Sequence, residues 1–75
     1  MTQIIEQVQN QPAFQRRVLI EFLDLQEKSR ALRAFLSSKA IDDLSPVDQN
    51  LLFEQYRIMG MYLGILESRL DRFTK

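Results

Sequence analysis

The second half of the chain holds the residues whose types and spacing suit ligand binding. Tyr56, Arg57 and Tyr62 place two aromatic rings and a guanidinium within seven positions. Arginine binds carboxylates and phosphates in a bidentate manner and stacks on flat rings, so this set could hold a small planar anion such as a nucleotide. Two glycines and a further arginine follow in the same segment. The candidate binding residues are Tyr56, Arg57, Gly60, Tyr62, Gly64 and Arg69.

Gly60 and Gly64 are unusual because each glycine inside a helix costs roughly 1 kcal/mol relative to alanine. Small residues four apart share one helix face and let another backbone or a flat ligand approach closely. Two interpretations stay open. The glycines either permit close helix packing inside the hairpin or an oligomer, or form a shallow groove for a ligand. The arginines likewise suit a binding site or ordinary surface ion pairs, of the kind expected for Asp24 with Lys28.

Several chemistries are excluded by composition. The chain has no cysteine and no histidine, which removes disulfides, the common zinc, copper and haem ligand sets, and Ser-His or Cys-His nucleophiles. No glycine-rich phosphate-binding loop precedes a helix. The adjacent Asp42 and Asp43 suit a turn better than a cation site. We therefore expect no catalytic residue, no metal ligand and no cofactor, and a protein that is not an enzyme.

Length and charge further restrict the classes of protein to which this chain could belong. Seventy-five residues allow one domain, expected here over residues 1–75. Ten basic and ten acidic residues cancel, whereas proteins that bind nucleic acid usually carry a basic excess, so nucleic acid is not an expected partner. No apolar stretch reaches the ~20 residues that span a bilayer, and the N-terminus lacks the basic start and apolar run of a secretory signal. A cytoplasmic protein is the expectation.

The fold class predicted by the apolar spacing is all-α, an antiparallel two-helix hairpin. The first helix is predicted at about residues 13–38, with Pro12 near its start. Its apolar seam steps by four and three residues through Val18, Phe22, Leu25, Ser29, Leu32 and Leu36. The second is predicted at residues 46–73, because Ser45, Pro46 and Asp48 form a strong helix-start signal. Residues 39–44 form a short linker. Residues 1–11 are an N-terminal extension, within which residues 2–9 could form a short helix.

The apolar surface of both helices is wider than one partner helix can cover. A chain this short also lacks the disulfides and bound metals that usually stabilise small domains, because both are excluded by its composition. We therefore expect a homo-oligomer, a dimer or higher, in which hairpins assemble into a helical bundle. The alternative is a monomer with scattered exposed leucines. The residues expected at the interface flank the main seams: Leu19, Leu23, Leu51, Ile58, Tyr62 and Ile65.

Two segments, RRVLIEFLDLQEKSRALRAFL and DLSPVDQNLLFEQYRIMGMYLGILESRL, carry a more specific pattern. The pattern comprises Phe35–Leu36 at the end of the first helix, Leu44–Ser45 after the linker, then Leu51, Leu52 and Gln55, then Met59, Tyr62–Leu63 and Ile65 to Arg69. Over Arg17 to Leu70 the chain resembles a family of small helical-hairpin proteins of tailed phages and prophages, with relatives first noticed in crAss-like phages. The two glycines and the first eleven residues depart from that pattern. The resemblance implies a phage origin and a host-bacterium cytoplasm.

Three functions fit these observations. The first is a non-enzymatic counter-defence inhibitor that docks on a host bacterial protein through an exposed helical face. The second is an oligomeric sponge that sequesters a small anionic signal such as a cyclic nucleotide. The third is a structural or assembly factor of the phage. Small phage proteins without catalytic residues often inhibit host machinery, which places the inhibitor first.

Overall fold

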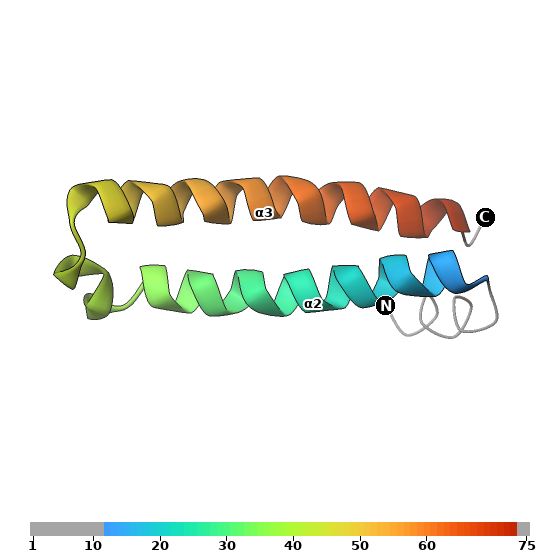
Figure 1. Ribbon diagram of the computed structural model, residues 1–75, viewed down its shortest axis with the longest axis horizontal. Helices are drawn as coiled ribbons and strands as arrows, with labels where there is room; N and C mark the ends of the chain where they lie inside the picture. Colours follow the sequence, from blue (N-terminus) through green and yellow to red (C-terminus); the bar gives the residue numbers. More distant parts are fainter. Residues whose placement is uncertain (1–11, 74–75) are drawn as a thin grey trace.

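Two long helices lie side by side and antiparallel in the computed structural model of the chain, which describes residues 12–73 (Figure 1). Helix α2 spans Ala13–Leu36, a short 3₁₀ helix η1 spans Lys39–Asp43, and helix α3 spans Pro46–Phe73. The molecule is a rod of 46 × 17 × 17 Å. The predicted all-α class with two long helices is confirmed over these residues. The N-terminal extension, including the short helix predicted over residues 2–9, lies outside them.

Helix α3 begins where the sequence signal predicts. The backbone amide of Asp48 donates a hydrogen bond to Ser45 Oγ at 3.2 Å, and Ser45 Oγ donates to Asp48 Oδ2 at 3.1 Å. These contacts satisfy an amide that has no partner within the first turn of the helix, and the carboxylate complements the helix dipole. Pro46 has no backbone N–H donor, but this costs no hydrogen bond because the first amides of a helix have no partner within the helix. The predicted bounds of this helix, residues 46–73, are therefore confirmed.

Helix α2 ends two residues earlier than the predicted residue 38. The amide of Ser38 donates to the carbonyl oxygen of Phe35 at 3.0 Å, a three-residue spacing that tightens the last turn. Ser38 Oγ donates to the same carbonyl oxygen at 2.7 Å. Ser38 itself is extended, with φ −95° and ψ 166°, so the α-helix stops at Leu36. Serine side chains that bond to nearby carbonyls favour such helix ends.

The predicted linker is more ordered than a simple turn. Residues Lys39–Asp43 form η1, which buries Ile41 to 8% exposure against the end of the hairpin. Gln49 then closes the corner by donating from Nε2 to the carbonyl oxygen of Leu44 at 2.9 Å. The corner therefore has its own apolar anchor and its own hydrogen bond, and it sets the two helices antiparallel.

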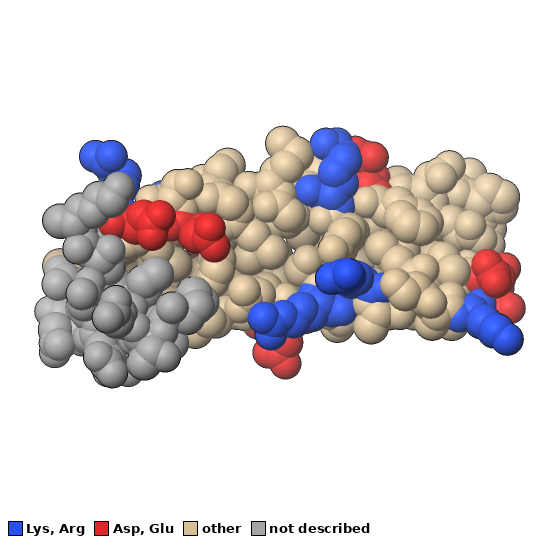
Figure 2. Space-filling view, turned by 180° about the vertical axis from the view of Figure 1, so that it is seen from behind, with Lys and Arg blue, Asp and Glu red and all other residues tan. Residues whose placement is uncertain are grey.

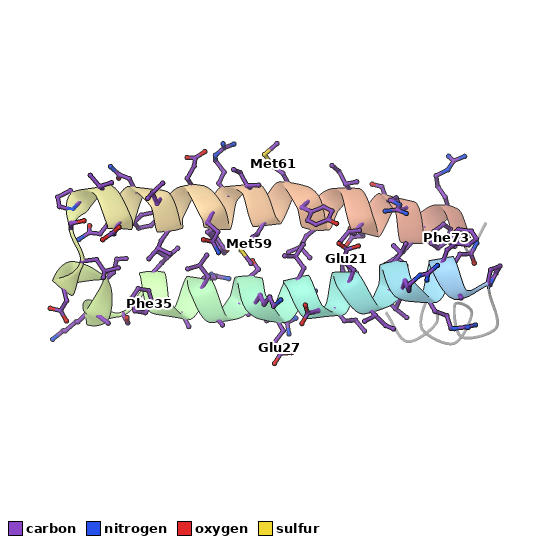
Figure 3. The ribbon with its side chains drawn as sticks, in the orientation of Figure 1. Glu21, Glu27, Phe35, Met59, Met61 and Phe73 are labelled. Carbon is purple, nitrogen blue, oxygen red and sulfur yellow. The ribbon has the colours of Figure 1, made fainter. Side chains whose placement is uncertain are left out.

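The helices meet along one heptad-spaced line on each. The predicted line on α2 is confirmed, because every member is buried or half-buried. We call the matching line on α3 the inner seam; it comprises Gln49, Leu52, Tyr56, Met59, Leu63, Leu66, Leu70 and Phe73. Figure 3 shows Met59 pointing towards α2 and Met61 pointing away from it. Steps of three and four residues keep a side chain on the contact line at every turn.

Burial is deepest towards the end of the hairpin where α2 begins and α3 ends (Figure 1). Leu66 and Leu70 are 0% and 1% exposed, and they pack with Val18, Leu19 and Phe22. Each such side chain contributes about 1.5–3 kcal/mol by leaving water. Beyond them the rings of Phe14 and Phe73 meet edge to face, with centroids 6.0 Å apart. The core therefore ends in an aromatic pair.

A two-helix layer covers only one side of each helix. Large apolar side chains consequently remain exposed on both helices, more of them on α3. Among the described residues, those on α3 are Val47, Leu51, Phe53, Ile58, Met61, Tyr62 and Ile65, and those on α2 are Phe14, Ile20, Leu23 and Phe35. Helix α3 is therefore the element on which a binding surface is to be sought.

Candidate functional site

A second heptad-spaced line runs along α3 beside the inner seam. We call it the outer stripe. Its members follow one another by four and three residues and are all exposed: Leu51, Gln55, Ile58, Tyr62, Ile65, Arg69 and Arg72. Leu51, Ile58 and Ile65 are each more than half exposed, at 62%, 52% and 59%. The stripe begins with apolar side chains and ends with two arginines.

Two shallow grooves follow the outer stripe. The tyrosine groove, nearer the start of α3, has a volume of about 370 Å³ and is lined by Leu51, Glu54, Gln55, Ile58, Met59 and Tyr62. The arginine groove, nearer the end, has a volume of about 520 Å³ and is lined by Met61, Gly64, Ile65, Ser68, Arg69 and Arg72. Both volumes fall in the range of about 300–1,000 Å³ common for small-molecule sites, although each groove is open on one side.

The arginine groove combines the chemistry that an organic anion requires. Met61 and Ile65 supply an apolar wall on which a flat ring can lie. Arg69 and Arg72 are one turn apart, so their guanidinium groups can reach the same anionic group. Guanidinium groups bind phosphate and carboxylate oxygens in pairs. The groove can therefore bind a molecule that has both a flat ring and a negative charge.

Gly60 and Gly64 leave open space on α3. Among the described residues, a Cβ atom built on either glycine would have no neighbour within 4 Å. The interpretation that these glycines permit close packing inside the hairpin is therefore wrong. The openings that remain face outward, where a ligand or another molecule could enter. Gly64 lines the arginine groove and Gly60 does not.

Tyr62 bridges the two helices from the outer stripe. Its hydroxyl donates a hydrogen bond to the carboxylate of Glu21 on α2. That hydrogen bond, with some desolvation and the negative charge of Glu21, raises the pKa of Tyr62 above its ordinary value, and Arg69 opposes the shift. The ring is thereby held in one place at the middle of the outer stripe, and its hydroxyl is already engaged within the chain.

Arg57 is also engaged within the chain. Its Nε donates to Glu54 Oε1 at 2.8 Å, its Nη2 bonds to the same oxygen, and its Nη1 lies 3.4 Å from the sulfur of Met61. The hydrogen bond and the opposite charges lower the pKa of Glu54 and raise the pKa of Arg57. Because Met61 lines the arginine groove, Arg57 lies at the edge of that groove, where Glu54 balances its charge.

The structure divides the predicted binding residues among several faces of α3. Tyr62 and Arg69 share the outer stripe, and Gly64 and Arg69 share the arginine groove. Tyr56 is half-buried in the inner seam. Arg57 is exposed and bonds to Glu54, and neither Tyr56 nor Arg57 lines either groove, so the structure does not place these two residues in one site.

The structure also separates the residues predicted for the oligomer interface. Leu51, Ile58, Tyr62 and Ile65 all lie on the outer stripe. Leu19 is 7% exposed and already packs in the core of the hairpin. Leu23 lies on α2 and is 37% exposed. A partner molecule could therefore cover four of these six side chains by contacting one face of α3.

Ser68 and Arg72 line the arginine groove, although neither is among the binding residues predicted from the sequence. The available signal was spacing, because Ser68 lies one turn after Gly64 and Arg72 lies one turn after Arg69. Small and basic residues recurring at these intervals share one helix face. Within residues 12–73 no cluster of acidic side chains is suited to hold a metal ion.

Charges of both signs are mixed on the surface. On the face shown in Figure 2, basic and acidic side chains lie in separate small groups along both helices rather than in one continuous basic band. A continuous basic band is the usual footprint of a protein that binds a nucleic-acid backbone. In the part of the chain that the structure describes, neither long helix is long and apolar enough to cross a membrane.

Comparison with known proteins identifies relatives that match the two-helix span of this chain in sequence. The model of the Sequestin family matches residues 12–72, which include α2, η1, both grooves and all of α3 except its last residue. This chain belongs to the Sequestin family. It is also 39% identical, over 61 residues, to a protein of Enterobacteria phage T4 described as an uncharacterized 7.5 kDa protein in the denB-rIIB intergenic region. The match covers 81% of this chain and 95% of the T4 protein.

These findings confirm the expected membership of a family of small phage proteins. No solved structure matches the chain. The Sequestin match begins at Pro12, and its range contains the outer stripe of α3.

Proposed function

We propose that this Sequestin-family protein sequesters a small anionic molecule, a nucleotide-type signal such as a cyclic nucleotide of bacterial immunity, in the cytoplasm of a phage-infected host. The observation that carries the proposal is the arginine groove, where an apolar wall, two small residues and two arginines lie on one exposed face. The family description agrees with a protein that holds a molecule. Sequestration would serve the phage by keeping the signal from its receptor.

The groove offers binding groups without an arrangement for catalysis. Gly64 and Ser68 leave room beside the helix backbone, Ile65 and Met61 contact a base, and Arg69 and Arg72 bind phosphate oxygens. General acid–base catalysis near neutral pH needs a group that exchanges protons in that range. Guanidinium groups stay protonated there, so the two arginines serve as anion ligands and not as a base.

Depletion of a nucleotide pool tests this proposal. The full chain is incubated with a small-molecule extract of phage-challenged host cells, and nucleotides remaining in the filtrate are quantified by mass spectrometry. We expect one anionic nucleotide to disappear from the filtrate and to return with unchanged mass when the protein is denatured by heat. A product of altered mass would indicate catalysis, and an unchanged filtrate would contradict sequestration.

A matched pair of variants locates the site. Arg69→Gln with Arg72→Gln removes both cations of the groove, whereas Arg30→Gln with Arg33→Gln removes two exposed cations of α2. Hydrogen bonds to charged groups are worth ~1.5–3 kcal/mol each, so we expect the first pair to weaken binding at least roughly tenfold. The second pair should leave binding unchanged. Equal losses in the two variants would contradict a site in the arginine groove.

A second candidate is an inhibitor that docks on a host protein, and the exposed apolar residues of the outer stripe favour it. Leu51, Ile58 and Ile65 form a line of the kind that inserts into a groove of another protein. Co-purification from infected cells separates the candidates. A host protein retained by the wild-type chain and lost with Ile58→Glu supports docking. Retention of a small molecule alone supports sequestration.

A further inference from the structure

We infer that the outer stripe of α3 is the contact surface for a second copy of this chain, packed antiparallel about a two-fold axis at Tyr62. The stripe is exposed along its whole length, from Leu51 to Arg72. At 1.5 Å per residue it is about 30 Å long. Its steps of four and three residues are those with which one helix packs along another.

The middle of the stripe, Ile58, Tyr62 and Ile65, reads alike in both directions. Ile58 lies four residues before Tyr62, and Ile65 lies three residues after it. In an antiparallel dimer centred at Tyr62, Ile58 of each copy therefore lies opposite Ile65 of the other copy. The two Tyr62 rings lie at the axis, between these two isoleucine pairs. A two-fold interface requires this self-complementarity, in which each residue meets its counterpart in both directions.

Charge decides between the antiparallel and the parallel arrangement. Glu54 lies eight residues before Tyr62, while Arg69 and Arg72 lie seven and ten residues after it. An antiparallel copy therefore brings Glu54 close to both arginines of the partner, at each end of the contact. A parallel copy would instead place carboxylate against carboxylate and guanidinium against guanidinium. Like charges across an interface oppose association, so the parallel arrangement is disfavoured.

Glu54 can accept these contacts without giving up Arg57. Both nitrogens of Arg57 that bond to Glu54 use the same oxygen, Oε1. The other oxygen of an ionised carboxylate has further acceptor sites. One carboxylate then lies among its own Arg57 and the partner's Arg69 and Arg72, which leaves an excess of positive charge at each end of the dimer.

The dimer has a consequence for the arginine groove, and this step rests on the proposed function. Ile65, Arg69 and Arg72 belong both to the stripe and to the groove. A second copy along the stripe therefore places its Leu51 and Glu54 end beside the open side of the groove. Each ligand site is then completed by both copies, and the excess positive charge remains available to an anion.

Cysteine cross-linking of the ligand-free protein tests the arrangement directly, because the chain has no cysteine of its own. The full chain is refolded from denaturant to remove bound small molecules. Tyr62→Cys should form a disulfide with its counterpart at the axis under mild oxidation. Leu51→Cys should not cross-link to itself but should cross-link to Arg72→Cys when the two variants are mixed. Self-cross-linking of Leu51→Cys would overturn the antiparallel register.

Mass in solution gives an independent measurement. Light scattering of the ligand-free chain should report twice the chain mass of 8.9 kDa. Ile58→Glu with Ile65→Glu should halve this mass, while Ile20→Glu, at an isoleucine of α2 that is also more than half exposed, should leave it unchanged. A monomeric wild-type chain, or a dimer that survives the Ile58 and Ile65 changes, overturns the inference.

Exchanging the charges tests the dimer even if the Ile58→Glu and Ile65→Glu variants fail to fold. Glu54→Arg alone should weaken the dimer, and combining it with Arg69→Glu and Arg72→Glu should restore the dimer. A dimer that is not restored would contradict the contact of Glu54 with the partner's Arg69 and Arg72. None of these measurements includes a ligand. A dimer that binds no nucleotide would therefore refute the proposed function alone, and a monomer that depletes a nucleotide would refute the dimer alone.

Discussion

Two lines of side chains run the length of α3 with the same spacing but different surroundings. The inner seam packs on α2 and contains Leu66 and Leu70, which are almost fully buried. The outer stripe contains Ile58 and Ile65, which are more than half exposed. Heptad spacing alone therefore does not show which line closes the hairpin and which remains for another molecule. The difference lies in the ends, because the inner seam ends in Leu70 and Phe73 and the outer stripe ends in Arg69 and Arg72.

Truncating one side chain on each line should distinguish the inner seam from the outer stripe most clearly. Leu66→Ala leaves a cavity in the core and should lower the free energy of unfolding by about 2–5 kcal/mol. Ile65→Ala, its neighbour on the outer stripe, should cost under about 1 kcal/mol in dilute protein, since exposed positions contribute little. Denaturant unfolding at low and high protein concentration measures both. Equal costs for the two changes in dilute protein would mean that the lines are not distinct.

Substituting the two glycines tests which outward-facing part of α3 binds the ligand. Alanine fits at both positions without a clash, so Gly60→Ala and Gly64→Ala should each raise the stability by roughly 0.5–1 kcal/mol. Only Gly64→Ala should weaken binding of the depleted nucleotide, because only Gly64 lines the arginine groove. Thermal unfolding and calorimetric titration provide the two measurements. Weaker binding in Gly60→Ala alone would place the site on another face.

The smallest expected effect concerns the contact between Tyr62 and Glu21. In a Tyr56→Phe background only Tyr62 titrates as a tyrosine, and its absorbance reports its pKa. Glu21→Ala should lower that pKa towards the ordinary value of 10.0, because the hydrogen bond and the negative charge that raise it are lost. A group whose pKa is raised by folding stabilises the protein below its unfolded pKa. This stabilisation should therefore disappear as the pH rises through the folded pKa. An unchanged pKa in Glu21→Ala would show that the contact is absent in solution.

Much of the fold could be predicted because its signals are local. The start of α3 follows from Ser45, Pro46 and Asp48, whose contacts involve only the first turn of that helix. The seam of α2 follows from spacing. The end of α2 and the helix η1 could not be predicted so well, because they depend on Ser38 bonding to a carbonyl and on Ile41 finding the end of the hairpin.

The candidate site was harder to predict, because spacing alone does not show which side chains of a helix are already engaged by the rest of the chain. Tyr56 and Arg57 are neighbours in the chain, yet one packs in the inner seam and the other bonds to Glu54. Arg69 and Gly64 were selected and do line one groove. Ser68 and Arg72, which line the same groove, were not among the predicted binding residues, because serine and arginine at the end of a helix also suit a solvated surface and a helix dipole.

Native mass spectrometry tests the central claim most directly. The chain is purified under gentle conditions from host cells challenged with phage, and its intact mass is compared with that of the refolded protein. Sequestration by a two-fold dimer predicts twice the chain mass of 8.9 kDa plus a small anionic nucleotide, and the refolded protein should lack that added mass. A protein that carries no small molecule under these conditions, with or without a host protein attached, would contradict the claim that it sequesters a nucleotide signal.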